Sequence, residues 1–204
     1  MRAAIINKWG DENVFEIKDV PKPSPDSKQI LIKVITSSIN PVDWKHRIGN
    51  HKLLLGSKFP IILGYDVCGE VIEVGSEITR FSLGDIVIGD LDNKYGGALA
   101  EYAIGHENCF SLKPNNISNE EGSAVPLAAL TALQALRDKG NLKTNQKVLI
   151  NGGSGGVGHF AIQIAHILGA KVIAVAGTRN QTFIQGFHPY KTIDTDWCAD
   201  FSNR

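Results

Sequence analysis

A glycine-rich segment at residues 151–158 constrains the fold of this 204-residue chain more than any other feature. It has the spacing G-x-G-x-x-G at Gly153, Gly155 and Gly158, directly after an apolar run that ends at Ile150. In such a loop the first glycine permits a tight turn, the second lets a pyrophosphate approach the backbone, and the third lets a helix pack close to the strand. The segment predicts a dinucleotide-binding loop, and the alternative is a glycine-rich structural turn. The residues predicted to contact the cofactor are Gly153, Ser154, Gly155, Gly156, Val157 and Gly158.

The segments around the loop alternate as strand, helix and strand. Buried-type strands are expected at 146–150 and 171–176, and the helix between them ends before Gly169, a residue suited to the C′ position. A short helix and the start of a third strand are expected at 178–186 and 191–193. This order predicts a right-handed βαβ unit within a doubly wound parallel sheet. Only 46 residues follow the loop, so a complete two-halved dinucleotide fold does not fit in the remainder.

The first 115 residues show a different pattern. Short runs, mostly rich in valine and isoleucine, are separated by turn sequences such as those at 21–25 and 96–97. Many short strands with recurring turn signals predict a barrel or a sandwich. The expected strands are 3–6, 14–20, 29–39, 67–74, 85–88 and 99–104.

The pattern changes near residue 116. Ser118 and Glu121 have the spacing of a capping box, in which the Ser oxygen accepts a backbone N–H and the Glu side chain reaches back. A helix-like segment follows at 124–136. We therefore expect an α/β protein, with a β-rich domain at 1–115 and the N-terminal part of a nucleotide-binding domain at 116–204.

The residues after the second strand of the βαβ unit indicate the cofactor. An NAD site usually places Asp or Glu about 20 residues beyond the loop, where it holds the ribose 2′-hydroxyl. Here the sequence at 176–180 is Ala-Gly-Thr-Arg-Asn, without an acid. Arg179 can pair with a 2′-phosphate, with Thr178 and Asn180 as hydrogen-bond donors, whereas a carboxylate would repel it. NADPH is therefore the expected cofactor; the alternative for Arg179 is a solvated residue at a helix start.

Composition excludes several classes of partner and compartment. Lys plus Arg and Asp plus Glu both number 21, so the formal net charge is zero, and neither nucleic acid nor an anionic membrane is an expected partner. No apolar run is long enough for a membrane span or a signal peptide. The three cysteines, Cys68, Cys109 and Cys198, form no CxxC pair, and we expect free thiols in the cytoplasm.

Several further motifs occur in a fixed order along the chain. They are Ser-Ile-Asn-Pro-Val-Asp-Trp-Lys at 38–45, the run at 60–71 around Gly-Tyr-Asp, and the segments at 97–102, 126–132 and 148–158. With these motifs the chain resembles the medium-chain dehydrogenase/reductase superfamily, in its zinc-independent quinone and enone reductase branch. The resemblance covers residues 1 to about 185. It implies an N-terminal GroES-like barrel followed by a Rossmann domain, with the active site in the cleft between them.

The zinc-dependent branch of that superfamily needs ligands that this sequence lacks. A catalytic zinc requires about three Cys, His or acidic ligands. At the family's first ligand position, usually Cys, this chain has Asn40, and at the Gly-His-Glu motif it has Gly64-Tyr65-Asp66. Asp66 and Asp43 alone cannot make a zinc site, and the four-Cys structural lobe is missing. We expect no metal, and hydride transfer from NADPH to a quinone or an α,β-unsaturated carbonyl compound.

The resemblance also implies which side chains face the reaction. It places Asn40 beside the nicotinamide, and Lys45 and Tyr65 near the substrate, where an ammonium or a hydroxyl would stabilise or protonate an enolate oxygen. Thr131 resembles the residue that contacts the nicotinamide ribose. The structural alternatives are a turn for Asn40, a solvated barrel residue for Lys45, wall packing for Tyr65 and helix-interior packing for Thr131.

The histidines carry weaker expectations. His46 and His51 flank the predicted cleft segment and are candidates for a proton relay. His159 and His166 lie seven residues apart on the predicted cofactor helix, and surface or packing roles are expected for them.

The C-terminal part departs from the family pattern. Thr195 stands where a tyrosine often lines the adenosine-phosphate pocket, and the rest of the Rossmann sheet and the segment that returns to the first domain are absent. Three hypotheses follow: an NADPH-dependent quinone or enone reductase, a truncated and inactive remnant or nucleotide-binding module, and a fragment or incomplete gene model of a longer enzyme. A homodimer is expected of the intact family. The sequence does not distinguish a quinone from an enone substrate.

Overall fold

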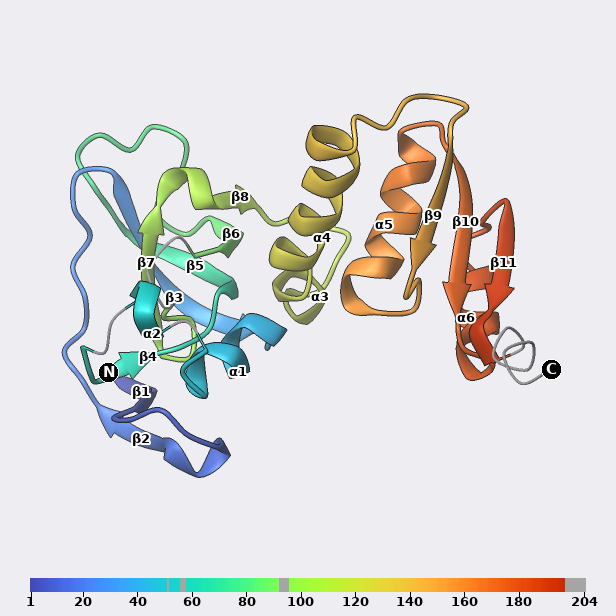
Figure 1. The fold of residues 1–204 in the computed structure, drawn as a ribbon. Coiled ribbons are helices and arrows are strands. Elements are labelled where there is room, and N and C mark those ends of the chain that lie inside the picture. Colours follow the sequence, from blue (N-terminus) through green and yellow to red (C-terminus); the bar gives the residue numbers. More distant parts are fainter. Residues whose placement is uncertain (51, 56–57, 92–95, 197–204) are drawn as a thin grey trace. The chain divides into compact units, whose positions relative to one another are not determined.

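The computed structural model describes residues 1–50, 52–55, 58–91 and 96–196. His51 and Cys198, which carried expectations above, lie outside these residues. The chain divides into two compact units, Met1–Leu127 and Ala128–Arg204, drawn in blue to green and in yellow to red in Figure 1. Each unit is described by itself below.

The first unit is built from two antiparallel sheets. A five-stranded sheet has the order β7-β3-β5-β6-β8, and a three-stranded sheet has the order β2-β1-β4. The strands are β1 Arg2–Ile6, β2 Phe15–Asp19, β3 Gln29–Ser37, β4 Ile61–Ile62, β5 Asp66–Val74, β6 Ile86–Asp90, β7 Tyr102–His106 and β8 Phe110–Leu112. All six strands expected from the sequence are present, with ends that differ by at most three residues. The sequence analysis missed β4 and β8, which have only two and three residues and so carry almost no periodicity.

The core of this unit follows from the strand alternation. Ile30 and Ile32 on β3 belong to one buried cluster with Val67 and Val71 on β5, and all four side chains are fully buried. Cys68 is also fully buried and takes the place of a small apolar side chain in this core.

Short helices close the first unit. They are η1 Glu12–Val14, α1 Pro41–Arg47, α2 Lys52–Leu55, η2 Glu107–Cys109 and α3 Asn119–Ser123. The capping box at the start of α3 has the expected geometry: the N–H of Glu121 donates to the Ser118 hydroxyl at 3.1 Å, and the Glu121 carboxylate accepts the Ser118 N–H at 2.8 Å. Because α3 packs against β3 and β5, the first compact unit extends to Leu127. The domain boundary at 115/116 stays a prediction.

The second unit contains a parallel sheet with the order β11-β10-β9. Its strands are β9 Lys147–Asn151, β10 Lys171–Ala176 and β11 Lys191–Asp194, and its helical segments are η3 Gln134–Lys139 (a π-helix), α5 Gly156–Ile167, η4 Thr178–Asn180 and α6 Gln181–Gln185. The α4 helix, Pro126–Leu133, runs across the division between the units and continues into η3. Figure 1 shows α5 lying along β9 and β10, as the expected βαβ unit requires.

Small and branched apolar side chains hold α5 on this sheet. Ile162 and Ala165 of α5 are fully buried with Val172 and Ala174 of β10. Gly169, at φ +76°, ends the helix as expected. The strand order, with the glycine-rich loop between the edge strand β9 and α5, is that of the first half of a Rossmann sheet. The chain is therefore α/β, and its two units agree with the GroES-like β-domain and partial Rossmann domain that the resemblance implies.

Candidate functional site

The first cluster of polar groups surrounds the carboxylate of Asp66, at the start of β5. Asp66 is fully buried, and its Oδ2 accepts hydrogen bonds from the Asn40 side-chain amide at 2.9 Å and the Ser38 hydroxyl at 3.1 Å. Its Oδ1 accepts the N–H of Leu127, in the first turn of α4, at 2.8 Å. One side chain thus joins the end of β3, the start of α1 and the start of α4.

Burial and hydrogen bonding act in opposite directions on this acid. Burial raises the pKa of Asp66 above its usual value, while the donors on Asn40, Leu127 and Ser38 oppose the rise. The amide of Asn40 is oriented by this contact, since its Nδ2 donates to Asp66 and its Oδ1 is therefore directed elsewhere. Sequence analysis named Asn40 but treated Asp66 only as an insufficient zinc ligand.

Asp43 fixes the same loop from the other side. Its carboxylate accepts the N–H of Asn40 at 2.7 Å and the N–H of Gly64 at 3.1 Å, and its side chain is almost fully buried. Burial raises the pKa of Asp43, and the nearby charge of Asp66 adds to the rise. Asp43 lies at the third position of α1, so it caps the helix that Asn40 begins. The sequence analysis did not predict α1, a seven-residue helix held by this contact.

Tyr65 and His46 form a second pair in the same unit. The Tyr65 hydroxyl lies 3.1 Å from Nδ1 of His46, and the two rings meet edge to face at 5.7 Å. His46 is 6% exposed, whereas Tyr65 is half-buried. A half-buried phenol bonded to a buried imidazole can hold and exchange a proton at the phenol oxygen. Wall packing was the structural alternative for Tyr65. Packing alone does not require the polar contact with His46 that the structure shows.

Lys45 lies on α1 next to this pair in the sequence. Its ammonium lies 5.7 Å from the centre of the Trp44 ring, and its side chain is half-buried. The structure thus brings Asn40, Lys45 and Tyr65 into one unit, on the β3–α1 connection, on α1 and just before β5. Their catalytic roles stay predictions.

The glycine-rich loop of the second unit has the geometry that a dinucleotide requires. At Gly158 an added Cβ would collide with the carbonyl oxygen of Gly152, which itself has a φ of +71°. At Gly156, by contrast, an added Cβ would meet no described atom within 4 Å. Position 158 is therefore closed by helix packing, while position 156 leaves the backbone open to an approaching ligand.

The direction of α5 completes this cradle. Gly155 is the N-cap of the 12-residue helix, and Ser154 precedes it. The first N–H groups of a helix have no partners within the helix, so those of Gly156 and Val157 can bind a phosphate. The loop is fastened to the sheet by the N–H of Gly153, which donates to the Val175 carbonyl of β10 at 2.8 Å. These residues fit a dinucleotide pyrophosphate.

The other predicted cofactor residues lie at two places in the second unit. Thr178, Arg179 and Asn180 form η4, directly after β10, and all three side chains are exposed. Thr131 lies on α4 and is also exposed, so helix-interior packing does not describe it. The sequence analysis found no acid near Thr178, but the fold places one there: the Asp196 carboxylate accepts the N–H of Thr178 at 3.1 Å.

The described residues contain no cluster of potential metal ligands and no helix that could cross a membrane. Within 1–50, 52–55, 58–91 and 96–196, no three or more His, Cys, Asp or Glu side chains gather closely enough to hold a metal ion. Over the same residues, no helix combines the length and apolar character needed to cross a bilayer.

His159 lies on α5, the helix that follows the glycine-rich loop. Its ring centre lies 4.1 Å from that of Phe160, and its Nδ1 lies 3.0 Å from the Gly155 carbonyl oxygen.

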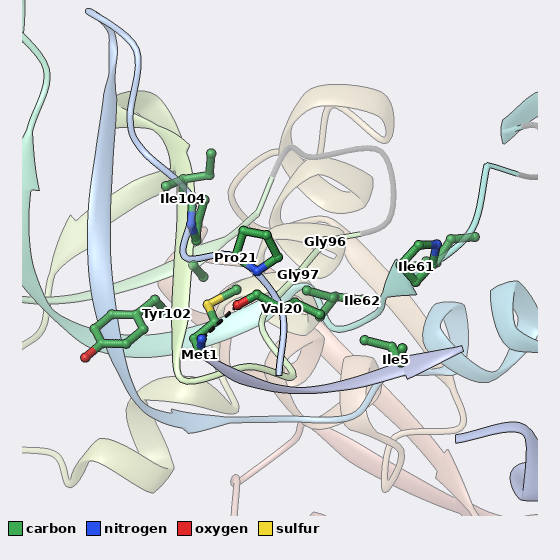
Figure 2. Close-up of a pocket in the computed structure, with 13 residues that line it drawn as sticks. Met1, Ile5, Val20, Pro21, Ile61, Ile62, Gly96, Gly97, Tyr102 and Ile104 are labelled. Atoms are coloured by element: carbon green, nitrogen blue, oxygen red, sulfur yellow. Dashed lines mark hydrogen bonds between the residues drawn. The ribbon is translucent and has the colours of Figure 1, made fainter. Parts of the chain in front are cut away.

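The first unit also contains a largely apolar pocket of about 450 Å³. It is lined by Met1, Ile5, Val20, Pro21, Pro23, Pro60, Ile61, Ile62, Gly96, Gly97, Tyr102, Ala103 and Ile104. Figure 2 shows the terminal amine of Met1 inside it, hydrogen-bonded to the Val20 carbonyl at 2.8 Å. Its lining residues are not those predicted from the sequence to take part in catalysis or cofactor binding, so this pocket is separate from the cluster around Asp66.

Comparison with known proteins identifies the first unit. Residues 26–115 match the family model of the alcohol dehydrogenase GroES-like domain. This stretch contains β3 through β8, and with them Asn40, Lys45, Tyr65 and Asp66.

Two curated relatives match nearly the whole chain. A chloroplastic quinone-oxidoreductase homolog of Spinacia oleracea is 41% identical over 190 residues, which are 91% of this chain and 58% of the relative. A chloroplastic NADPH-dependent alkenal/one oxidoreductase of Arabidopsis thaliana is 34% identical over 207 residues, or 95% of this chain and 52% of the relative. The chain thus spans slightly more than half of the length of these proteins.

A solved structure agrees with the sequence matches. The quinone oxidoreductase from Coxiella burnetii superposes with a TM-score of 0.87 and 36% identity, over 95% of this chain and 62% of that one. The GroES-like match, the relatives and this superposition agree with the order of sheets and the glycine-rich loop described above. The chain belongs to the medium-chain dehydrogenase/reductase superfamily, in its quinone oxidoreductase and enone reductase branch.

Proposed function

We propose that the chain performs the NADPH-dependent reduction of a quinone or an α,β-unsaturated carbonyl compound, without zinc. The observation that carries this proposal is the 2.9 Å hydrogen bond from the Asn40 amide to the buried carboxylate of Asp66. These residues occupy the positions at which zinc-dependent members bind their metal, and here they satisfy each other. A site without a Lewis acid must stabilise the developing negative charge with hydrogen bonds and a nearby cation.

The cofactor part of the proposal rests on the second unit. The open backbone at Gly156 and the start of α5 suit the pyrophosphate, while Thr178, Arg179 and Asn180 suit a 2′-phosphate. A relative whose printed name includes NADPH dependence supports the same choice. When bound, a reduced nicotinamide supplies the hydride for the reaction.

The side chains of the first unit supply the proton chemistry. The Tyr65 hydroxyl holds a proton at its oxygen, and the neighbouring Nδ1 of His46 at 3.1 Å can replace that proton once it is donated. The ammonium of Lys45 would stabilise an enolate or quinol oxygen. Asn40, oriented by Asp66, would position the nicotinamide amide by hydrogen bonding. A cytoplasmic location and a homodimer remain part of this proposal, while both relatives named above are chloroplastic.

Steady-state turnover tests the proposal. The purified chain is mixed with NADPH and, separately, a benzoquinone, an α,β-unsaturated aldehyde and an α,β-unsaturated ketone, and the loss of NADPH absorbance is followed. Turnover that persists after treatment with a metal chelator supports the proposal, and turnover that the chelator abolishes and zinc restores contradicts its metal-free part. NADPH binding without turnover of any substrate would instead support a nucleotide-binding module.

A further inference from the structure

The fold places an acidic side chain where the sequence shows none. Strands β10 and β11 are parallel, with Ala176 opposite Asp194 in the register. Beyond this pair both segments leave the strands, and a hydrogen bond joins Thr178 to Asp196. The Gln181 side chain fastens these strand ends together, because its amide donates to the carbonyls of Ala176 at 2.6 Å and Ile193 at 3.1 Å.

The Asp196 carboxylate is directed at the connection after β10. It accepts the N–H of Thr178 at 3.1 Å, and a Cβ added at Gly177 would lie 3.5 Å from one of its oxygens. Its own backbone N–H donates to Asp194 at 2.9 Å, which orients the segment. The backbone N–H of Thr178 is the main cause that lowers the pKa of Asp196, and the charge of Arg179 contributes as well, so the side chain is an anion at neutral pH.

We propose that Asp196 determines cofactor specificity, by occupying the place at which a 2′-phosphate would approach Thr178 and Arg179. This inference rests on the proposed function for the location of the adenosine ribose. The carboxylate competes with the 2′-phosphate for the Thr178 N–H and repels its charge. It can also accept a hydrogen bond from a free ribose 2′-hydroxyl, as the acid of NAD sites does. With Asp196 in place, the preference for NADPH over NADH is smaller than the one Arg179 alone would produce.

The sequence carries two signals for the cofactor, both of which favour a 2′-phosphate, and the fold adds an opposing charge. Arg179 favours the phosphate, and no acid follows β10 within the usual spacing. The acid instead comes from the end of the next strand, 18 residues beyond Thr178. Arg179 and Asp196 act in opposite directions on the same phosphate.

Equilibrium binding tests the inference without requiring turnover. The dissociation constants of NADPH and NADH are measured by titration calorimetry for the unmutated chain, Asp196→Asn and the control Asp138→Asn. Asp138 is another exposed acid of the second unit, paired with Arg137 on η3 at 2.6 Å. The side chain of Asp196 is exposed, and thermal melts verify that the variants fold.

Asp196→Asn is expected to tighten NADPH binding by about tenfold, while NADH binding stays the same or weakens. The control should change neither constant. Adenosine 2′,5′-bisphosphate and adenosine 5′-monophosphate, used as probes in the same titrations, should repeat the contrast because they isolate the phosphate. The inference would be overturned if Asp196→Asn changed the affinities for NADPH and NADH equally, and those for the two adenosine probes equally, or changed none of them. Absence of turnover with a preserved contrast would overturn only the proposed reductase activity. If neither the unmutated chain nor Asp196→Asn bound NADPH, both the proposed function and this inference would be overturned.

Discussion

The side-chain amide of Asn40 donates to the buried carboxylate of Asp66 at 2.9 Å, across 26 positions of the sequence. Asp66 is 0% exposed, so water cannot replace this donor if it is lost. The contact therefore has a structural role as well as an orienting one, and the two roles can be measured separately.

Asn40→Ala should lower the free energy of unfolding by about 2 kcal/mol, because a buried carboxylate loses a hydrogen-bond donor. Ser38→Ala removes the second donor to the same oxygen, at 3.1 Å, and should cost less, about 1 kcal/mol. Urea denaturation at neutral pH measures both. Ser82→Ala serves as a control, since Ser82 bonds to Asp85 through its backbone: its N–H donates to the Asp85 carboxylate at 2.8 Å and its carbonyl accepts the Asp85 N–H at 3.2 Å. An Asn40→Ala variant as stable as this control would show that Asp66 finds another partner.

The raised pKa of Asp66 fixes the sign of a pH effect. Because its folded pKa lies above the usual 3.8, the stability it contributes is fully present below pH 3.8 and is lost as pH rises through the raised value. The unmutated chain should therefore lose unfolding free energy relative to Asp66→Asn as the pH rises. Urea titrations at a series of pH values follow this difference.

Asp138 provides the opposite case for the same titrations. Its exposed carboxylate has a pKa lowered by the hydrogen bond from Arg137, so its contribution is present above pH 3.8 and is lost as pH falls through the lowered value. The difference for Asp138→Asn should be small and have the reverse slope. Two slopes of the same sign would contradict the assignment of burial as the dominant effect on Asp66.

The Tyr65–His46 contact predicts a specific kinetic pattern. Tyr65→Phe should lower kcat for enone reduction by about a hundredfold with little change in KM, because the variant loses the proton on the hydroxyl and keeps the ring. His46→Gln should have a smaller effect on kcat, since it removes the ring nitrogen that exchanges a proton with the Tyr65 hydroxyl at 3.1 Å. Tyr102→Phe removes a hydroxyl from the separate pocket of the same unit and is the control. If Tyr65→Phe matched the control, Tyr65 would have only a packing role.

Local patterns in the sequence predicted much of the fold. The capping box at Ser118 and the glycine that ends α5 act within a few residues, and the structure contains both. The strands β9 and β10 were predicted because continuous apolar runs are typical of parallel strands. β10 is largely buried as expected, whereas the expected burial of β9 is wrong, since only Ile150 of that strand is buried. The α1 helix was missed because it has seven residues, and its capping carboxylate also serves Gly64, which is distant in the sequence.

The contacts that define the candidate sites could not be predicted in this way. Asp66 meets Asn40 only when β5 pairs with β3, and Asp196 meets Thr178 only when β11 pairs with β10 in the observed register. A spacing rule that searches about 20 residues beyond a glycine loop cannot detect an acid that a later strand delivers. The resemblance named Asn40, but only the fold shows that Asp66 is its partner.

Two glycines of one loop should respond in opposite ways to the same substitution. Gly158→Ala places a Cβ against the Gly152 carbonyl, so the loop must shift, and we expect a loss of about 1–3 kcal/mol of unfolding free energy together with weaker nucleotide binding. Gly156→Ala meets no described atom within 4 Å and reduces the freedom of the unfolded chain, so stability should be unchanged or rise by up to about 1 kcal/mol.

Nucleotide affinity separates the two variants further. At Gly156 the new methyl group projects into the space through which a pyrophosphate would reach the start of α5, so the Kd for NADPH should rise by at least about tenfold in a fully folded protein. Thermal melts and calorimetric titrations on the same samples measure both quantities. The left-handed Gly169→Ala, at φ +76° and outside the loop, should destabilise the fold while leaving the affinity of the folded chain unchanged. If Gly156→Ala bound NADPH as tightly as the unmutated chain, the open face at position 156 would not be where the pyrophosphate lies.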